Sequence, residues 1–521
     1  MKKIIATCLC AITLAGCTSE KPGYIPTGNG LYVDNTTAVP TLPPNAGEQV
    51  IALGYDPTEL CNPYHSGNTA NRLVFNLLYQ GLFSVDDRYQ VHPMLCKQFS
   101  VSRDMKTYIF YPEAATFSDG SVLTAEDVAA SLLAAKANPV YTGRLTEVNS
   151  VQVTANGGVE VRLNIPYENL PILLDMPIVK ASQVAEEFPL GTGPYRLERG
   201  ENKLWLLRRD NWWCRASMPI TADYISLTAT ENPAALRDAF EFGKVNFACA
   251  DPGSGSYVDF RCDYELWDCE SGYFLYLACN QNSKVFSNKA IRSKLTHAVN
   301  RDQLVEELFR HFARSAYLPA SPESPYYDNK LAGQYGYDPQ KLTEAVTAAE
   351  LESNAVKLLV NGADGRRVQA ARAIAKMLEG CGLSVTVESV SGTAYTTALK
   401  NGSYDLHLGQ TKLPQNMDLT AFFSTEGALN YGSLADAICY SLCQEAMGNF
   451  GNYYSLHRTV MDDGMLVPIA FRSYAIYVAR GALDVLNPAR DNISSIPWEN
   501  PWRTAKWKVD STATAPEGGS E

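Results

Sequence analysis

The stretch FSDGSVLTAEDVAASL, residues 117–132, joins a tight turn to a strong helix start. The Ser-Asp-Gly triplet at 118–120 favours a turn, because its glycine can adopt a positive φ at no steric cost. Thr124 can cap the following helix, with Asp127 three residues later in the capping-box position. Apolar residues then recur at helical spacing through the rest of the stretch. Taken alone, these features predict a well-capped surface helix rather than a catalytic group of carboxylates.

The composition indicates a large folded protein. The chain has 521 residues, more than one hydrophobic core usually serves, so we expect two or three domains. Hydrophobic residues make up 46% and charged residues 19%, which is the balance of a globular protein. The formal net charge of −12 argues against a nucleic-acid-binding protein, which would need a basic face.

The N-terminus predicts a lipoprotein signal peptide. Lys2 and Lys3 precede an apolar segment at residues 4–14, which is too short to span a bilayer permanently. The letters LAGC at 14–17 are similar to a bacterial lipobox, which implies that Cys17 is lipidated and anchors the protein. An ordinary cleaved signal with a chance cysteine is the alternative.

Ten cysteines remain after Cys8, Cys10 and Cys17 are set aside. An even number outside the cytosol permits disulfides, but the sequence leaves the pairing open. The chain has no CxxC motif and no histidine at zinc-like spacing from a cysteine pair, so we expect no structural zinc.

The chain changes character along its length. Residues 151–165 alternate around the turn Asn-Gly-Gly at 156–158, which predicts a β-hairpin in a β-rich region. Later, a strand at 356–360, a helix at 366–379 and a strand at 383–387 predict a βαβ unit in a parallel sheet.

Other motifs accompany the opening stretch in a fixed order. They are GTGPYRLE at 191–198, RRDNWW at 208–213, the series Asn280, Phe286, Arg292 and Arg301, GYDPQKL at 336–342 and YDLHLGQ at 404–410. Together they resemble the family 5 extracellular solute-binding proteins of ABC importers, which include oligopeptide, dipeptide and nickel binders. The resemblance extends over residues 50–508. One departure is Gln410, which stands where the family usually has a tryptophan, near the expected cleft.

The resemblance implies an α/β fold of the periplasmic-binding-protein type (class II), with two lobes and an extra β-rich domain inserted in the first lobe. The opening stretch would then belong to the scaffold of the inserted domain. The expected divisions are the signal peptide 1–17, a flexible tether 18–48, a first lobe of 49–75, 190–247 and 466–510, the inserted domain 76–189, a second lobe 248–465 and a disordered tail 511–521.

The same resemblance implies a binding protein and not an enzyme. We expect a monomeric lipoprotein that captures short peptides in a hinge-closed cleft and delivers them to ABC permease subunits with cytoplasmic ATPases. Its place would be the cell envelope, lipid-anchored on the outer face of the cytoplasmic membrane, or the periplasm of a Gram-negative cell. We expect no cofactor, no metal and no nucleic-acid partner.

Peptide binding sets definite chemical needs: a carboxylate for the amino group, and Arg or Lys for the carboxyl group. Asp418 resembles the family's cleft aspartate and is expected to bind an amine; a helix cap before Leu419 is the alternative. Arg472 binds a ligand carboxylate or pairs with a structural acid. The other expected ligand-binding residues are Gln410, Thr411, Asn430, Tyr431, Tyr55, Phe471 and Tyr474, and the expected hinge residues are Tyr276 and Asn280.

Three other functions stay open. The same fold could bind a metal chelate, heme or a sugar, or could serve as an adhesin or sensor without transport. A secreted hydrolase is the third, but the chain has no G-x-S-x-G and no H-E-x-x-H, and DPGSGSY at 251–257 is typical of a loop. Cleavage of peptides by the purified protein would favour the hydrolase.

Overall fold

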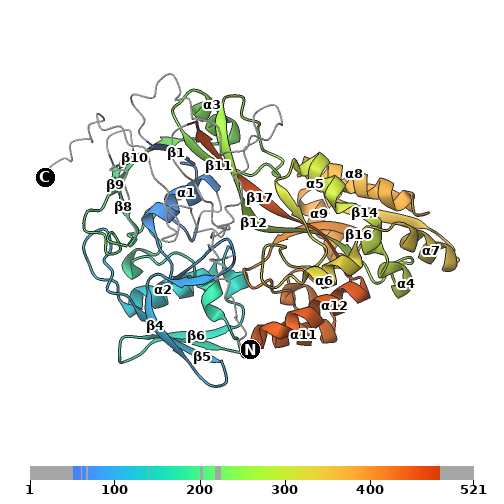
Figure 1. Cartoon of the computed structure of the whole chain (residues 1–521), viewed down its shortest axis with the longest axis horizontal. Coiled ribbons are helices and arrows are strands. Elements are labelled where there is room, and N and C mark those ends of the chain that lie inside the picture. The colour runs from blue at the N-terminus through green and yellow to red at the C-terminus, as the bar shows by residue number, and fades with distance from the viewer. Residues whose placement is uncertain are drawn as a thin grey trace, which may run out of the picture.

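A computed structural model describes residues 51–480, apart from 60–61, 66–68, 139, 200–203 and 218–223. The expected signal peptide with Cys17, the tether and the tail lie outside the described residues. No helix within the described part is long and apolar enough to cross a membrane. Figure 1 shows two α/β bodies joined by two long strands, with a β-rich body beside the first.

One sheet of eleven strands runs through both α/β bodies. We call the body built on β11, β1, β10, β9 and β8 the first lobe, and the body built on β16, β14 and β15 the second lobe, with β12 and β17 shared between them (Figure 1). The bounds in sheet order are β15 Ser384–Val390, β14 Ala355–Asn361, β16 Leu406–Lys412, β12 Tyr264–Cys279, β17 Leu466–Ala479, β11 Phe247–Ala250, β1 Ile51–Tyr55, β10 Tyr224–Ala229, β9 Leu204–Arg208 and β8 Tyr195–Arg199, with β13 Ala313–Ser315 on β17.

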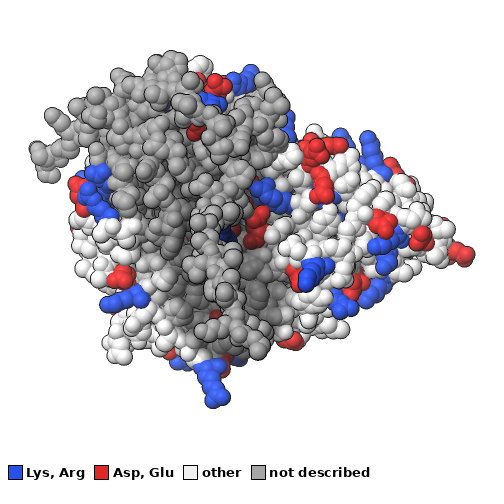
Figure 2. Space-filling model, in the orientation of Figure 1, with Lys and Arg blue, Asp and Glu red and all other residues white. Residues whose placement is uncertain are grey.

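The helices cover this sheet and fill its connections. They are α1 Thr69–Leu78, α3 Pro233–Glu241, α4 Lys289–Arg292, α5 Arg301–Phe309, α6 Asn329–Ala332, α7 Gln340–Ala348, α8 Gly365–Glu379, α9 Gly392–Lys400, α10 Thr420–Phe423, α11 Ala437–Gly448 and α12 Tyr453–Asp463. Side chains of both charge signs are interspersed over the second lobe on the face that Figure 2 shows.

The predicted βαβ unit is confirmed in the second lobe. β14 is parallel to β15, from the pair Ala355 and Ser384 onward, and α8 connects the two strands. Asp364 caps α8, because its carboxylate accepts the backbone N–H groups of Arg366 and Arg367. Strand, capped helix and strand are all encoded within 36 consecutive residues, from the start of β14 at 355 to the end of β15 at 390, so local sequence decides them.

The β-rich body, which we call the inserted domain, holds a sheet of β4 Cys96–Val101, β5 Thr107–Pro112, β7 Val159–Leu163 and β6 Val148–Val153, the hairpin of β2 Phe83–Val85 and β3 Val91–Pro93, and the helix α2 Ala125–Ala137. The predicted hairpin is confirmed as β6 and β7.

The opening stretch forms the capped start of α2, as predicted. Asp127 Oδ2 accepts from the Thr124 backbone N–H at 2.9 Å, and Thr124 Oγ1 accepts in return from the Asp127 N–H. Asp119 pairs with Lys180 at 2.5 Å. Partial burial raises the pKa of Asp119, but the bonds from Lys180 and Ser121 outweigh it and bring that pKa to about 2. These carboxylates therefore serve the scaffold.

The two shared strands are interrupted where they pass between the lobes. β12 pairs with β17 as far as Glu270 opposite Ser473, and pairing resumes at Phe274 opposite Phe471. Gly272 lies in the interruption with φ +71°, in the left-handed region that favours glycine. Bulges of this kind bend a strand and increase its local twist. The interruption therefore lies where the two strands pass between the lobes.

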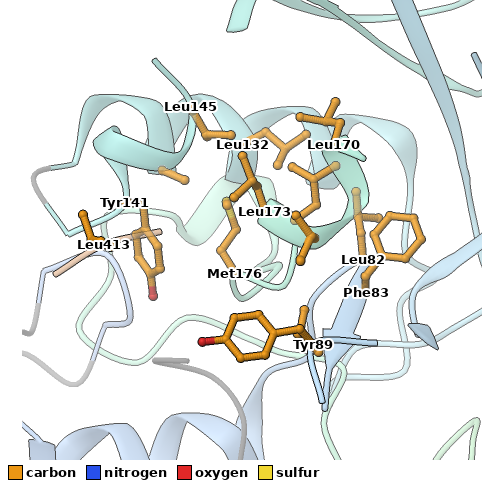
Figure 3. Packing of buried hydrophobic residues seen from close by; sticks show 14 of the residues in the cluster. Leu82, Phe83, Tyr89, Leu132, Tyr141, Leu145, Leu170, Leu173, Met176 and Leu413 are labelled. Atoms are coloured by element: carbon orange, nitrogen blue, oxygen red, sulfur yellow. The ribbon is translucent and has the colours of Figure 1, made fainter. Parts of the chain in front are cut away.

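The inserted domain shares its core with a segment of the second lobe. Figure 3 shows the leucines and tyrosines of this core, with Leu413 beside Tyr141 at one edge. Leu413 directly follows β16, and it belongs to one buried cluster that also takes in side chains of the inserted domain and of the first lobe. The domain limits given above stay a prediction.

Candidate ligand-binding site

Arg472 lies on β17 between the lobes and is only 2% exposed. Its Nη1 donates to Gln410 Oε1 on β16 at 2.6 Å, and its Nη2 forms an ion pair with Asp251, directly after β11. The Tyr273 ring covers the guanidinium, with 5.5 Å from Cζ to the ring centroid. Arg472 thus links Asp251, which follows a first-lobe strand, to the Gln410 amide of the second lobe. Pairing with a structural acid is one of the two roles that the sequence left open for Arg472.

Positive side chains of both lobes meet around Tyr474. The buried Tyr474 hydroxyl accepts from Arg72 Nη1 of α1 at 3.1 Å. Lys412 Nζ, at the end of β16, lies 6.0 Å from the Tyr474 ring centroid and 5.8 Å from that of Tyr273. Thr411 lies beside Lys412 and is half-buried. This part of the molecule therefore carries the chemistry that a ligand carboxylate would need.

Phe471 and Tyr276 belong to the core. Both are at most 2% exposed, and both stack on Phe274, with ring centroids 5.1 Å and 5.3 Å away. Phe422 meets Tyr276 edge-on at 5.0 Å. Burial raises the pKa of Tyr276 far above its usual range. These rings support the shared strands from inside.

Tyr55 and Asn280 form hydrogen bonds with segments that are distant in the sequence. Tyr55 ends β1, and its carbonyl accepts from the Thr230 N–H at 2.7 Å. Asn280 follows β12 directly, and its Nδ2 donates to the carbonyls of Gly402 at 3.0 Å and Tyr404 at 2.7 Å. Tyr276 lies at a second register shift of the β12–β17 pairing, between Leu275 and Tyr276, and Asn280 lies beyond the strand. The hinge role of both residues stays a prediction.

Asn430 and Tyr431 lie in the loop between α10 and α11. The Asn430 side chain is used within this loop, because its Oδ1 accepts from the Ala435 N–H at 2.9 Å and its Nδ2 donates to the Thr425 carbonyl at 3.2 Å. Tyr431 packs against a small core that includes Tyr404.

Asp418 lies half-buried in the loop between β16 and α10. Its Oδ1 accepts from the Thr420 N–H at 2.8 Å and from Thr420 Oγ1 at 2.5 Å, which anchors the start of the short helix. Both of these bonds end on Oδ1. Burial raises the pKa of Asp418. The bonds to Thr420 show the helix-anchoring role of Asp418, and its binding of an amine stays a prediction.

The structure adds neighbours that sequence reasoning missed. Glu147 and Tyr167 of the inserted domain lie close enough to Asp418 for its charge to act on both, and Gln415 is buried in the same loop as Asp418. Asp251, the partner of Arg472, was missed as well. None of the four belongs to a recognisable motif, and only the folded chain brings them to these positions.

The predicted residues fall into three groups rather than one. Gln410, Arg472 and Tyr474 surround the lobe junction with Thr411 nearby, Asp418 faces the inserted domain, and Asn430 with Tyr431 forms a loop of the second lobe. No three His, Cys, Asp or Glu side chains among the described residues are placed to hold a metal ion.

A comparison with protein families identifies the family to which the chain belongs. The profile of bacterial extracellular solute-binding proteins, family 5 (middle region), matches residues 90–427, more than half of the 521 residues. The chain belongs to this family. The resemblance inferred from the motifs is thereby confirmed.

A sequence comparison with individual proteins supports the same family. The glutathione-binding protein GsiB of Salmonella typhimurium is 26% identical over 319 residues, which is 58% of this chain and 62% of GsiB. The matched segment thus spans less than two thirds of that relative.

Solved structures show the fold. NikA from Brucella suis, in complex with Fe(III)-EDTA, is 19% identical and covers 88% of this chain and 100% of its own, with a TM-score of 0.68. The oligopeptide-binding protein AppA from Bacillus subtilis, in complex with a nonapeptide, is 18% identical and covers 87% and 97%, with a TM-score of 0.60. The predicted two-lobed periplasmic-binding-protein fold is confirmed.

Proposed function

We propose that this family 5 chain is the substrate-binding component of an ABC importer and captures short peptides between its lobes. Membership of a solute-binding family is the observation that carries the proposal. The interrupted strand pair β12 and β17 supports it, because a bend at the lobe junction suits closure around a ligand.

The charge layout favours a peptide among the possible ligands. Asp418 carries a carboxylate, and the cationic side chains of Arg72 and Lys412 lie near Tyr474. A peptide carries an ammonium group at one end and a carboxylate at the other, which need protein groups of opposite charge at separate places. GsiB, named for glutathione, and AppA, solved with a nonapeptide, are relatives with peptide ligands.

Two buried histidines are poorly suited to act as catalytic bases. Burial lowers the pKa of His407 and of His457 to about 3, so both stay neutral near pH 7 and are weak bases. General-base catalysis works best with a group whose pKa lies near the operating pH.

The proposal extends to the membrane. We propose that Cys17 carries the lipid anchor, that the mature protein is a monomer on the outer face of the cytoplasmic membrane or in the periplasm, and that it docks on a permease driven by cytoplasmic ATPases. The LAGC letters at 14–17 support the anchor.

Identification of the natural cargo tests the proposed function. Residues 18–521 are purified without the anchor and denatured, and the released small molecules are identified by mass spectrometry. We expect a set of short peptides. A discrete non-peptide compound, such as a metal chelate, would overturn the peptide assignment, and peptide cleavage by the native protein would overturn the binding role.

A further inference from the structure

The inserted domain is fixed to the first lobe by a buried arginine. Arg209 directly follows β9 of the first lobe and is only 3% exposed. Its Nη2 donates to the carbonyls of Thr116 at 2.9 Å and of Phe117 at 2.8 Å, both in the inserted domain. Its Nη1 donates to the Gly193 carbonyl of the first lobe at 2.9 Å. The first lobe and the inserted domain are therefore held together as one body.

The inserted domain also touches the second lobe, through Glu168. The Glu168 backbone N–H donates to the Met447 carbonyl in the last turn of α11 at 2.9 Å. Glu168 Oε2 accepts from the Phe450 backbone N–H, just after α11, at 2.8 Å. Figure 1 accordingly shows α11 beside the inserted domain. One residue of the inserted domain thus pairs with two backbone groups of the second lobe.

The two backbones come close at the same point. A Cβ atom on Gly448 would lie 3.6 Å from Pro166 Cβ, which is van der Waals contact. We call this contact, between residues 166–168 of the inserted domain and residues 447–450 of the second lobe, the latch.

Each side of the latch is held by its own body. In the inserted domain, the Tyr108 hydroxyl of β5 donates to the Tyr167 carbonyl at 2.6 Å, and the Tyr167 N–H donates to the Met105 carbonyl at 3.0 Å. In the second lobe, the Phe450 ring packs on that of Tyr326, with 5.2 Å between the ring centroids. The shape of each side therefore does not depend on the contact between them.

A second contact joins the same two bodies. Gln415 Nε2 of the second lobe donates to Asp175 Oδ2 of the inserted domain at 2.9 Å, and Asp175 also forms a buried ion pair with Arg144. The Tyr453 hydroxyl, just beyond the latch, donates to the Asn416 carbonyl at 2.5 Å. The loop that holds Gln415 is thus linked to the latch side of the second lobe.

We propose that the latch parts and re-forms as the lobes open and close, so that the inserted domain holds the closed form and slows ligand exchange. The lobes share β12 and β17, whose pairing is interrupted at Gly272. A body fixed to the first lobe must separate from the second lobe if the lobes move apart. Hydrogen bonds at the surface exchange readily for bonds to water, so such a contact is reversible. The inference rests on the proposed function and deepens it, because it assigns the inserted domain a part in retaining the ligand.

A disulfide across the latch tests the inference. The double variant Pro166→Cys with Gly448→Cys places two Cβ atoms 3.6 Å apart, within the range of about 3.5–4.5 Å that a disulfide needs. The delipidated protein is oxidised without ligand by oxidised glutathione, and the bond is verified by peptide mapping. The probe is a short peptide identified among the released cargo. We expect the oxidised variant to bind it at least about tenfold more slowly than the same protein after reduction, because the ligand cannot enter a locked cleft.

Single variants control for the native thiols. Wild type, Pro166→Cys and Gly448→Cys, taken through the same oxidation and reduction, should bind the peptide at one common rate. A wild-type rate in the oxidised double variant would show that the latch does not part, and would overturn the proposal. Failure of the disulfide to form in the folded double variant would show that the two sides do not meet in solution, with the same consequence.

Glu168→Ala tests the latch without a new bond. It removes the carboxylate that accepts the Phe450 N–H, and we expect peptide release to become about threefold faster. The matched control is Glu187→Ala, an exposed acid of the same domain, which should leave the release rate unchanged. Equal release rates in these two variants would contradict the latch. This arm also decides the question if the double variant fails to fold.

Solution scattering separates the latch from the proposed function. If neither wild type nor the reduced double variant binds any peptide, the proposed function fails. The latch is then decided on the ligand-free protein, because the oxidised double variant should have a smaller radius of gyration than its reduced form. Equal radii would overturn the latch as well.

Discussion

Single side chains at the lobe junction are held with little freedom. The Arg472 guanidinium is fixed by Asp251 and Gln410 and lies against the backbone of Gly253. A Cβ atom on Gly253 would lie 2.5 Å from Arg472 Cζ, well inside van der Waals contact. Glycine is therefore required at this position by packing, although no sequence motif marks it.

We expect Gly253→Ala to displace the Arg472 guanidinium and break its ion pair with Asp251. A buried charge that loses its partner is costly, so the free energy of unfolding should fall by about 2–4 kcal/mol. Chemical denaturation measures it. Gly143→Ala is the control, because a Cβ there would have no atom within 4 Å. Equal stability of both variants would show that Arg472 moves without cost.

The two buried histidines predict a pH dependence of stability. The native pKa of His407 and of His457 is about 3, below the unfolded value of about 6.5. As the pH falls below about 6.5, the unfolded state binds protons that the native state does not. The free energy of unfolding should then drop by up to about 1.4 kcal/mol per pH unit for each histidine.

Denaturant titrations between pH 7.5 and pH 5 measure this slope. His65→Gln, a change at an exposed residue, should leave the slope as it is. Imidazole NMR signals of His407 and His457 that titrate above pH 5 would contradict the prediction.

At the scale of elements, helix starts and strand pairs were predictable where the signal is local. The capping box of α2, the hairpin β6–β7 and the unit β14–α8–β15 each lie within a short stretch, so turn residues and periodicity suffice. The pairing of Asp251 with Arg472 joins residues 221 positions apart, and Gln415 reaches Asp175 only after two domains pack. Such contacts leave no pattern in a single sequence.

We expect Thr124→Ala to destabilise α2 and the inserted domain. The substitution removes the side chain that caps the Asp127 N–H, which typically costs about 1 kcal/mol. Thr397→Ala, on the exposed side of α9, is the matched control and should be neutral or slightly stabilising. Equal unfolding midpoints of the two variants in urea would argue against the capping box as a source of stability.

At the scale of the whole molecule, the family and its two-lobed fold could be predicted, and the site only in part. Family motifs such as GTGPY mark scaffold turns, which relatives share whatever they bind. Asp418 was singled out by its place in the family pattern, and its role in ligand binding stays a prediction. Gln410, a departure from the family, turned out to be a partner of Arg472.

Gln415→Ala should loosen the contact between the second lobe and the inserted domain. The change removes the donor to the buried Asp175 and leaves its Oδ2 with one partner fewer. We expect a shift toward an open form, seen as a larger radius of gyration in solution scattering, with ligand affinity about three- to tenfold lower. Gln340→Ala, on the exposed surface of α7, controls for loss of the amide. An unchanged radius and affinity would mean that this contact does not govern closure.

The order in which the chain is made bears on when the protein can work. β17 is the last described strand to be synthesised, yet it pairs with β11, β12 and β13. The sheet that begins at β1 in the first lobe therefore cannot be completed until residue 479 has been made. The β14–α8–β15 unit has all its partners close by and can form much earlier. A nascent chain that stops short of β17 would therefore hold a finished part of the second lobe but lack a strand that joins the two lobes.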